Sequence, residues 1–393
     1  MTIDNPLFAL FATAVALLSF WIINRNKLVF IEKGRYDNID GLRGYLAFFV
    51  FLHHSLVWYF YIKTGSWNIL NSHFYNQLGQ ASVVFFFMIT GFLFYAKIIQ
   101  KDKKIDWARL YLSRALRLFP LYLFSISLLL AIVVFLSNAQ LNEPVLMLIK
   151  HVIQWVGFSI AGSPNVNGIE QTFTINAGVT WSLAYEWFFY LSLPFLSLLH
   201  NLKSNNKPPL RYLIISLLGM LFILIYQPQV ISAKAFLSGM VAAHLVKYNK
   251  IQNFAQKRTS SIIIIGCLIA TVIFSQTAYG KLPLILLSIA FILIVCGNTL
   301  FGILTQPLSR AFGEMAYSVY LLHGILLYLV LKVIIGTDKV KLMSVTEYWT
   351  LILLLCPLLV LISRATYQLI EYPCMHSTDK LLLWIRGKFN THV

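Results

Sequence analysis

The feature that most constrains this chain is a series of apolar segments, each about long enough to cross a bilayer. A spanning helix needs roughly 20 mainly apolar residues, because the hydrocarbon core is about 30 Å thick and a helix rises about 1.5 Å per residue. Eleven segments fit, at about 7–24, 44–62, 81–99, 118–136, 180–199, 212–226, 229–246, 261–276, 282–298, 312–335 and 347–370. The sequence therefore predicts an all-α integral membrane protein with about eleven transmembrane helices.

Composition excludes the other classes of protein. Only 11% of the 393 residues are charged, against about 25% in soluble domains, so a water-soluble globular fold is excluded. Four cysteines are too dilute for a disulfide scaffold and form no metal-binding pattern, so no metal is expected. A twelfth segment, about 145–160, contains Lys150, His151 and Gln154 and is expected to be an interfacial or re-entrant helix.

The distribution of positive charge predicts the orientation. Arg25 and Lys27 follow the first apolar run, which is typical of an uncleaved signal anchor with its N-terminus outside. In that orientation 23 of the 31 Lys and Arg residues lie in inner segments and five in outer ones. This asymmetry places the C-terminus in the cytoplasm and accounts for the net charge of +17 without nucleic acid as a partner.

Ionisable side chains inside spans are costly, so each one is a functional candidate. His54 and His323 each lie about 15 Å from the inner ends of their spans, and Glu186 reaches a similar depth from the outer side. These three groups can share one layer, although His323 could equally be a hydrogen-bonding strut. Lys332 lies near the outer end of its span and is expected to extend its ammonium group to the interface.

Arg43 and His54 lie on one face of the second span. They are eleven residues apart, about three helical turns, so a cation at the cytoplasmic end aligns with a group that titrates near neutrality. Such a histidine suits general base catalysis. His53 is rotated from it by about 100° and is the alternative base, or merely lines a polar cavity.

The most basic inner segment carries Lys101, Lys103 and Lys104 and then Arg114 and Arg117. Arginines at positions i and i+3 project from one face, and the start of a helix favours anions through its free N–H groups and its dipole. The pair is therefore a candidate cytoplasmic phosphate clamp. The alternative is the ordinary excess of positive charge on the inner side.

Six motifs occur in one order along most of the chain. They are Ile39-Asp40-Gly41-Leu42-Arg43-Gly44 with His54; Phe86-Phe87-Met88-Ile89-Thr90-Gly91-Phe92; Arg114-Ala115-Leu116-Arg117 with Pro120; Thr180-Trp181-Ser182-Leu183-Ala184-Tyr185-Glu186 with Tyr190 and Pro194; Tyr317-Ser318-Val319-Tyr320-Leu321-Leu322-His323; and Glu371-Tyr372-Pro373. In this order the chain resembles acyltransferase family 3, the membrane-bound O-acyltransferases that modify bacterial polysaccharide and lipopolysaccharide. It departs from the family pattern at Thr90, where Ser is usual, and at Tyr372, where Arg is common.

The resemblance implies a ten-helix acyltransferase bundle over residues 38–375, preceded by an added helix and linker (1–37) and followed by a cytoplasmic tail (376–393). It implies transfer of an acyl group, commonly acetyl, from cytoplasmic acyl-CoA to a hydroxyl of an extracytoplasmic or lipid-linked glycan. Acyl-CoA is then a co-substrate, and no cofactor is permanently bound. The implied partners are the glycan or glycolipid acceptor, the lipid bilayer and polysaccharide-assembly proteins, and the implied location is the bacterial inner membrane.

The resemblance also assigns roles. His54 becomes the catalytic histidine with Arg43 as its partner, Arg114 and Arg117 serve the donor, and Glu371 lies near the cytoplasmic mouth. Apart from the resemblance, Glu186 or Tyr190 is expected to orient the histidine or bind the sugar. Two alternatives remain: a transporter or flippase that uses buried His and Glu as proton relays, and a non-enzymatic component of a polysaccharide-assembly complex.

Overall fold

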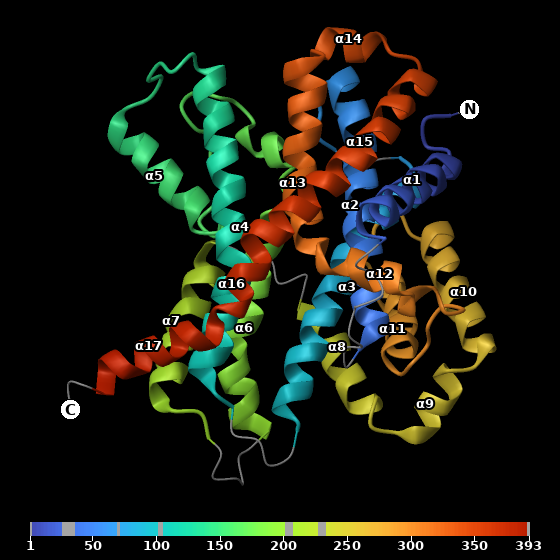
Figure 1. The fold of residues 1–393 in the computed structure, drawn as a ribbon, viewed down its shortest axis with the longest axis vertical. Coiled ribbons are helices and arrows are strands. Elements are labelled where there is room, and N and C mark those ends of the chain that lie inside the picture. Colours follow the sequence, from blue (N-terminus) through green and yellow to red (C-terminus); the bar gives the residue numbers. More distant parts are fainter. Residues whose placement is uncertain are drawn as a thin grey trace. The chain divides into compact units, whose positions relative to one another are not determined.

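In the computed structural model, every regular element of the described residues is a helix (Figure 1). The described residues are 2–25, 36–68, 71–100, 105–200, 207–226 and 233–390. Lys27, Lys101, Lys103 and Lys104, which entered the charge argument above, lie outside them. Among the described residues, seven helical segments are long and apolar enough to cross a membrane. The all-α membrane class predicted from hydropathy is therefore confirmed.

The seven segments begin with α1 (Pro6–Asn24), α2 (Asp37–Thr64), α3 (His73–Ile98), α4 (Trp107–Leu136) and α6 (Trp181–His200). The sixth joins α13 (Ala316–Tyr328) to the π-helix η4 (Leu329–Ile334). The seventh runs over Val345–Gly387 through α15 (Val345–Thr366), the π-helix η5 (Tyr367–Glu371), α16 (Tyr372–His376) and α17 (Thr378–Asn390).

Shorter helices occupy the other predicted spans. They are α7 (Leu210–Tyr226), α8 (Ala233–Leu245), α10 (Arg258–Phe274) and α11 (Lys281–Val295). A 77° bend separates α10 from α9 (Asn249–Ala255), and together these two pass as an eighth, broken span. The remaining helices are α5 (Val145–Val156), η2 (Thr172–Asn176), η3 (Ile303–Thr305), α12 (Pro307–Glu314) and α14 (Thr337–Leu342).

The chain divides into two compact units. The first unit contains residues 1–96 and 231–364, and the second contains residues 97–230 and 365–393. The boundaries predicted above, at 37/38 and 375/376, are not tested by this division and stay predictions.

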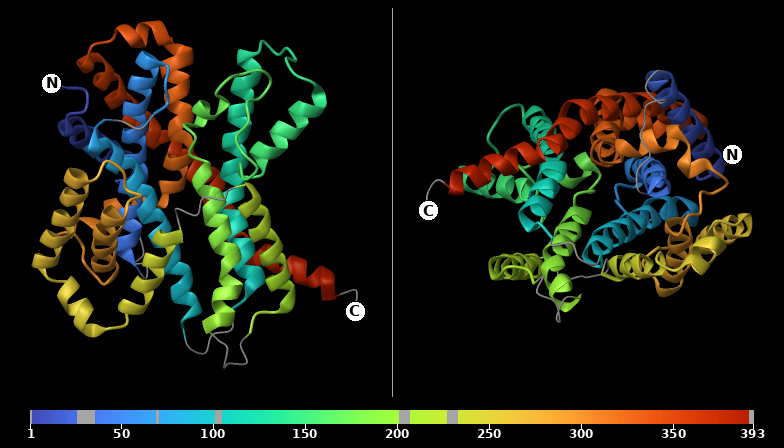
Figure 2. Two further views of the ribbon diagram at one scale, coloured as in Figure 1. Left: turned by 180° about the vertical axis from the view of Figure 1, so that it is seen from behind. Right: turned by 60° about the horizontal axis from the view of Figure 1, so that its bottom comes forward.

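Helix α2 is the centre of the first unit, where it packs against α12 and α13 (Figures 1 and 2). The glycines of the Asp-Gly-Leu-Arg-Gly motif make this close packing possible. A Cβ on Gly41 would lie 1.8 Å from the Leu304 carbonyl oxygen, and one on Gly44 would lie 2.5 Å from the Phe312 ring. The glycines of this motif therefore allow η3 and α12 to pack closely on α2, the helix that carries Arg43 and His54.

Helix α1 packs on the same unit through one narrow face. Its buried residues are Ala9, Ala12, Ala16, Phe20 and Asn24. Phe8 stacks on Trp349 with ring centroids 4.9 Å apart, and the Trp349 indole N–H donates to the Ile3 carbonyl at 2.8 Å. Leu10 and Phe11 on the other side are more than half exposed. This is expected for a membrane helix that packs on the protein through small side chains and faces lipid with large apolar ones.

In the second unit, α4 begins at Trp107, eleven residues before the predicted start of this span at about 118. The Asp106 carboxylate caps the helix by accepting a hydrogen bond from the Arg109 backbone N–H at 3.1 Å. It also accepts from the Arg386 guanidinium at 2.6 Å, and Arg109 pairs with Asp379 at 2.8 Å. Partial burial raises the pKa of Asp106, but the hydrogen bonds from Arg109 and Arg386 outweigh it and lower that pKa. These two ion pairs connect α17 to the start of α4.

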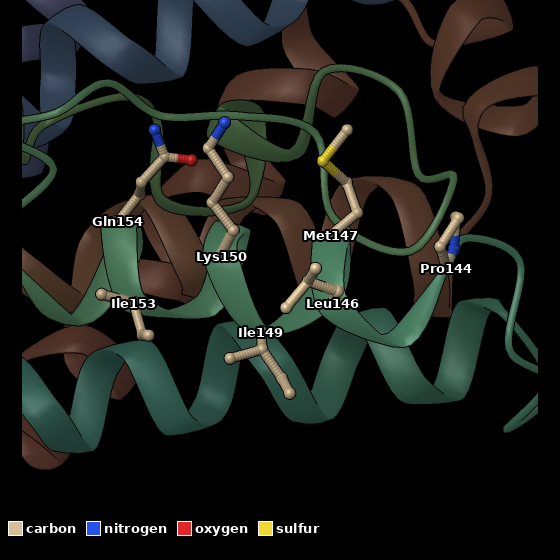
Figure 3. Close-up of a pocket in the computed structure, with 7 residues that line it drawn as sticks. All are labelled: Pro144, Leu146, Met147, Ile149, Lys150, Ile153 and Gln154. Atoms are coloured by element: carbon tan, nitrogen blue, oxygen red, sulfur yellow. The ribbon is translucent and has the colours of Figure 1, made fainter.

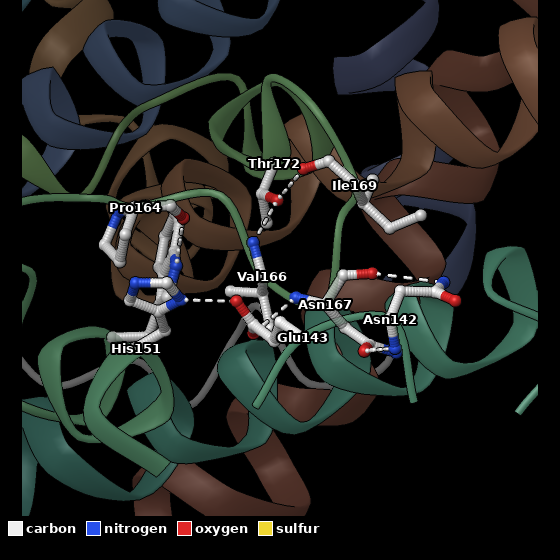
Figure 4. A network of polar contacts seen from close by, with 9 residues as sticks. Asn142, Glu143, His151, Pro164, Val166, Asn167, Ile169 and Thr172 are labelled. Atoms are coloured by element: carbon white, nitrogen blue, oxygen red, sulfur yellow. Dashed lines mark hydrogen bonds and ion pairs between the residues drawn. The ribbon is translucent and has the colours of Figure 1, made fainter. Parts of the chain in front are cut away.

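Polar contacts join the loop that follows α5 to the residues just before that helix (Figure 4). One Glu143 oxygen accepts from the Asn167 backbone N–H at 2.7 Å, and the other pairs with His151 at 3.0 Å. Asn167 accepts from the Asn142 backbone N–H at 2.8 Å. The Thr172 hydroxyl joins the Val166 N–H to the Ile169 carbonyl. These contacts hold α5 and the segment before α6 in one arrangement.

A groove of about 560 Å³ runs along α5 (Figure 3). Its lining is almost wholly apolar and includes the exposed Leu146 and Ile153. No candidate site residue lines it. Helix α5 is apolar and, at 12 residues, shorter than a membrane span; its expected interfacial or re-entrant position stays a prediction.

Candidate active site

In the first unit, the structure brings His54 and His323 together across α2 and α13. The His54 Nδ1 atom lies 3.0 Å from His323 Nε2, and the two rings are stacked with centroids 5.1 Å apart. His323 is fully buried, and its Nδ1 lies 2.9 Å from the carbonyl oxygen of Val319 on the preceding turn. The depth arithmetic that placed both histidines in one layer thus agrees with their contact.

These two contacts determine where the protons lie in the neutral pair. The Val319 carbonyl can only accept, so His323 Nδ1 must carry a hydrogen and donate it. In a neutral imidazole the other nitrogen then holds a lone pair, so His323 Nε2 accepts from His54 Nδ1–H. It follows that His54 Nε2 has the lone pair. A base of this tautomer, oriented by a second group, is the arrangement that hydroxyl activation requires.

His53 is held differently. Its Nδ1 donates to the Tyr75 carbonyl at 2.9 Å, and Gly79 makes room for its ring. A Cβ on Gly79 would lie 2.4 Å from the His53 ring. The Tyr75 hydroxyl in turn donates to the Asn5 carbonyl at 3.2 Å. His53 is therefore held between α2 and α3 by a backbone carbonyl, whereas the Nδ1–H of His54 is held by the imidazole of His323.

Arg43 and Thr90 lie in the same unit as the histidine pair. Arg43 is half-buried on α2, about 16 Å along the helix axis from His54. Thr90 is half-buried on α3. With the two residues about 16 Å apart along α2, the expected partnership of Arg43 with His54 stays a prediction.

In the second unit, Arg114, Tyr190 and Glu186 form a polar cluster between α4 and α6, in which Tyr190 is buried and the other two are half-buried. The Tyr190 hydroxyl donates to the Glu186 carboxylate, and the Arg114 guanidinium interacts with both Tyr190 and Glu186. Tyr190 is only 1% exposed. Arg114 is thus charge-balanced inside the protein, because a buried cation is stable only when an anion or dipoles compensate it.

Arg117 differs from Arg114 although the two are one turn apart. It is half-buried, and among the described residues no carboxylate lies within ion-pair distance of it. Both arginines lie two to three turns inside α4, so the helix-start contribution to anion binding expected from the sequence is wrong. Asp106 caps the true start, and that start is used by the contacts to α17.

The other candidates stay separate. Glu371 ends the π-helix η5 in the second unit and is 1% exposed. Glu186 belongs to the second unit and His54 to the first, so their expected proximity stays a prediction. In the part of the chain that the structure describes, no group of three or more His, Cys, Asp or Glu side chains could hold a metal ion.

A sequence model described as an acyltransferase domain matches residues 36–367. The chain belongs to acyltransferase family 3. No match was found among curated proteins or among solved structures.

The family match gives the geometry a chemical context. It contains the histidine pair, Arg43, Thr90 and the Arg114 cluster, whereas α1 precedes it and Glu371 follows it by four residues. An acyltransferase must remove a proton from the acceptor as it attacks an acyl carbonyl. His53 and His54 both keep a lone pair on Nε2, and of the two only His54 donates its Nδ1–H to a second imidazole, that of His323.

Sequence reasoning missed the aromatic side chains around His54. Trp67 stacks on its ring with centroids 6.2 Å apart and an interplanar angle of 25°. Trp67 lies in the loop after α2, and aromatic residues make up 15% of the chain, so no pattern distinguished it.

Proposed function

We propose that this membrane acyltransferase moves an acetyl group from cytoplasmic acetyl-CoA to a hydroxyl of an extracytoplasmic or lipid-linked glycan. The observation that carries the proposal is the hydrogen-bond chain from His54 through His323 to the Val319 carbonyl. These hydrogen bonds support a base role for His54 Nε2, and membership of the acyltransferase family gives the reaction class.

His54 is the proposed base of the acyl transfer. His54 Nε2 takes the proton of the acceptor hydroxyl as its oxygen attacks the thioester carbonyl carbon. The new C–O bond forms, the C–S bond breaks, and the thiolate of CoA takes the proton back from His54. During this step the His54 imidazolium is stabilised by the lone pair of His323 Nε2, because His54 Nδ1–H becomes a stronger donor. An acyl-histidine intermediate is the alternative route, and rapid-quench trapping of acylated His54 would distinguish it.

The donor side is assigned to the arginines. Arg117 binds a phosphate of acyl-CoA, because its guanidinium has the fork geometry that phosphate oxygens fit and no described carboxylate neutralises it. Arg114 holds Tyr190 and Glu186 in place beside it. By family resemblance Arg43 is the partner of His54, and Glu371 lies near the cytoplasmic mouth.

The proposed topology has eleven spans, with the N-terminus outside and the C-terminus in the cytoplasm. The charge asymmetry of the loops supports this orientation. The shorter helices α7, α8, α10 and α11 complete the count, and α5 lies in the outer interface with its apolar face in lipid. The proposed location is the bacterial inner membrane, beside polysaccharide-assembly proteins.

Mass spectrometry of surface glycans from cells with and without the protein tests the proposal. We expect each modified glycan to lose an acetyl mass when the protein is absent and to regain it when the wild-type chain is restored. Identical glycan masses would contradict the proposal. Release of free thiol from acetyl-CoA by the purified protein separates it from the transporter alternative, because a transporter or flippase releases none.

A further inference from the structure

A continuous group of aromatic rings leads away from His54 in the first unit. Trp67 stacks on the His54 ring, and Trp58 lies edge-on to Trp67 with centroids 5.4 Å apart. Trp58 also contacts Tyr328 of α13 at 5.8 Å, and Tyr61 contacts both tryptophans at 5.3 Å. We call Trp58, Tyr61, Trp67 and Tyr328 the aromatic cluster. Tyr61, Trp67 and His54 are each partly exposed.

Lys332 lies next to Tyr328, at the end of the aromatic cluster farthest from His54 in the series of ring contacts. Its ammonium lies 5.1 Å from the centroid of the Tyr328 ring, and the residue is half-buried. No carboxylate of the described residues lies within ion-pair distance of it. The lysine therefore packs over Tyr328 beside the aromatic cluster, rather than only extending to the interface as the sequence suggested. A cation inside a membrane span marks a substrate path by default, and its natural partner is an anion.

The backbone around Lys332 also departs from a regular helix. It lies in the π-helix η4, directly after Tyr328. Such π-helical turns are rare and are frequent at functional sites. The irregular turn changes the direction in which Lys332 projects relative to the α-helix before it.

The same end of the unit carries further positive charge. Helix α14 contacts η4 and α2 (Figure 1). It carries exposed Lys339 and Lys341, and Lys63 lies in the last turn of α2. On the proposed topology these lysines face the outside, where the positive-inside rule disfavours them, so topology does not explain them. Asp338 and Glu347 offset them only in part. The resulting potential attracts anionic ligands.

We propose that the aromatic cluster and Lys332 form an acceptor subsite selective for an anionic sugar. The apolar C–H face of a pyranose packs on Trp67 and Tyr61, as sugar and ligand sites commonly use aromatic walls with a few polar groups. A carboxylate or a phosphate of the same glycan pairs with Lys332, and the acceptor hydroxyl meets His54. The inference rests on the proposed function, because it assumes that His54 acts on an acceptor hydroxyl.

The test uses the full-length protein in nanodiscs with acetyl-CoA and three acceptors. These are a neutral glucose disaccharide, the same disaccharide with one glucuronate, and the same disaccharide with one phosphate. Acetyl transfer is measured by mass spectrometry of the product. We expect kcat/KM at least about tenfold higher for the two anionic acceptors, the effect of one charge-assisted contact. A preference for only one of them identifies whether the anion is a carboxylate or a phosphate.

Variants then assign the preference to Lys332. Lys332→Gln should bring the ratio of anionic to neutral kcat/KM close to one, and Lys332→Arg should keep it high. Lys281→Gln, which removes one exposed cation at the start of α11, is the matched control and should keep the wild-type ratio. Trp67→Ala should raise KM for all three acceptors while the KM for acetyl-CoA stays unchanged.

Three results would overturn the inference. They are equal use of all three acceptors by the wild-type protein, a preference that survives in Lys332→Gln, and a preference lost equally in Lys281→Gln. In the first two cases the proposed function still stands, because transfer itself occurs. If the wild-type protein acetylates none of the three acceptors, both the proposed function and the inference are contradicted.

Discussion

Replacing His323 by Phe tests the hydrogen-bond chain on which the base role of His54 depends. The Phe ring fills a similar volume in this fully buried position but offers no acceptor to His54 Nδ1–H. In the resting enzyme the lost bond is a neutral one, worth about 0.5–1.5 kcal/mol. In the transition state His54 is an imidazolium, and the same bond is worth about 1.5–3 kcal/mol.

Only the difference between these two values affects the chemical step, because catalysis depends on interactions that are stronger in the transition state. The difference of about 1–2 kcal/mol predicts a fall in kcat of about 5- to 30-fold, with the KM for acetyl-CoA unchanged. The assay is acceptor-dependent thiol release from acetyl-CoA by the purified protein. Thermal unfolding of each variant controls for loss of fold.

His323→Gln is the matched variant, since its amide oxygen can accept the same hydrogen bond. We expect it to recover most of the lost kcat, whereas a residue that only fills space would make Gln worse than Phe. The reasoning is refuted if the Phe variant keeps wild-type kcat, or if Phe and Gln lower kcat equally.

Three further predictions concern the second unit. Arg117→Ala should raise the KM for acetyl-CoA about tenfold or more without changing the acceptor KM, because a charge-assisted phosphate contact is lost; equal KM values would contradict the donor role. Arg114→Ala should destabilise the protein by about 1–3 kcal/mol in thermal or denaturant unfolding, since Tyr190 and Glu186 lose a half-buried cation; adding Glu186→Ala should recover part of that loss, and no recovery would contradict the pairing. The pKa of Asp106 is lowered from 3.8 by its hydrogen bonds in spite of burial, so its contribution to stability is present above that value and is lost as the pH falls through the lowered pKa. Hydrogen exchange in α17 should therefore rise at strongly acid pH in the wild type and be fast already at neutral pH in Asp106→Asn, and identical exchange in both would contradict the account.

Hydropathy predicted the helices well because a spanning helix must satisfy its own backbone and cover itself with apolar side chains. It placed the start of α4 too late. The first turns of α4 are amphipathic and rich in arginine, so they read as a cytoplasmic loop. Their helix is stabilised by the Asp106 cap and by the long-range pairs to α17, which no local pattern contains.

Site residues could be predicted from the sequence where a reactive side chain lies on a regular helix, because helix geometry then gives its depth and its face. The spacing from Arg43 to His54 and the depths of His54 and His323 follow from helix geometry. The pairing of Arg114 with Glu186 was not predicted. From the sequence, Arg114 suited a phosphate clamp and Glu186 suited a site near the histidines. The aromatic cluster was missed since its members come from α2, the following loop and α13, and meet only in the fold.

The central claim, that His54 is the base of acyl transfer, is tested most directly by thiol release from acetyl-CoA in purified His54→Ala and His53→Ala variants. Loss of a general base lowers the rate by about 10²- to 10⁴-fold. The account predicts a loss of this size in His54→Ala, in a protein that still inserts and folds, and activity within a few-fold of wild type in His53→Ala. Near-normal activity in His54→Ala together with loss of activity in His53→Ala would contradict it.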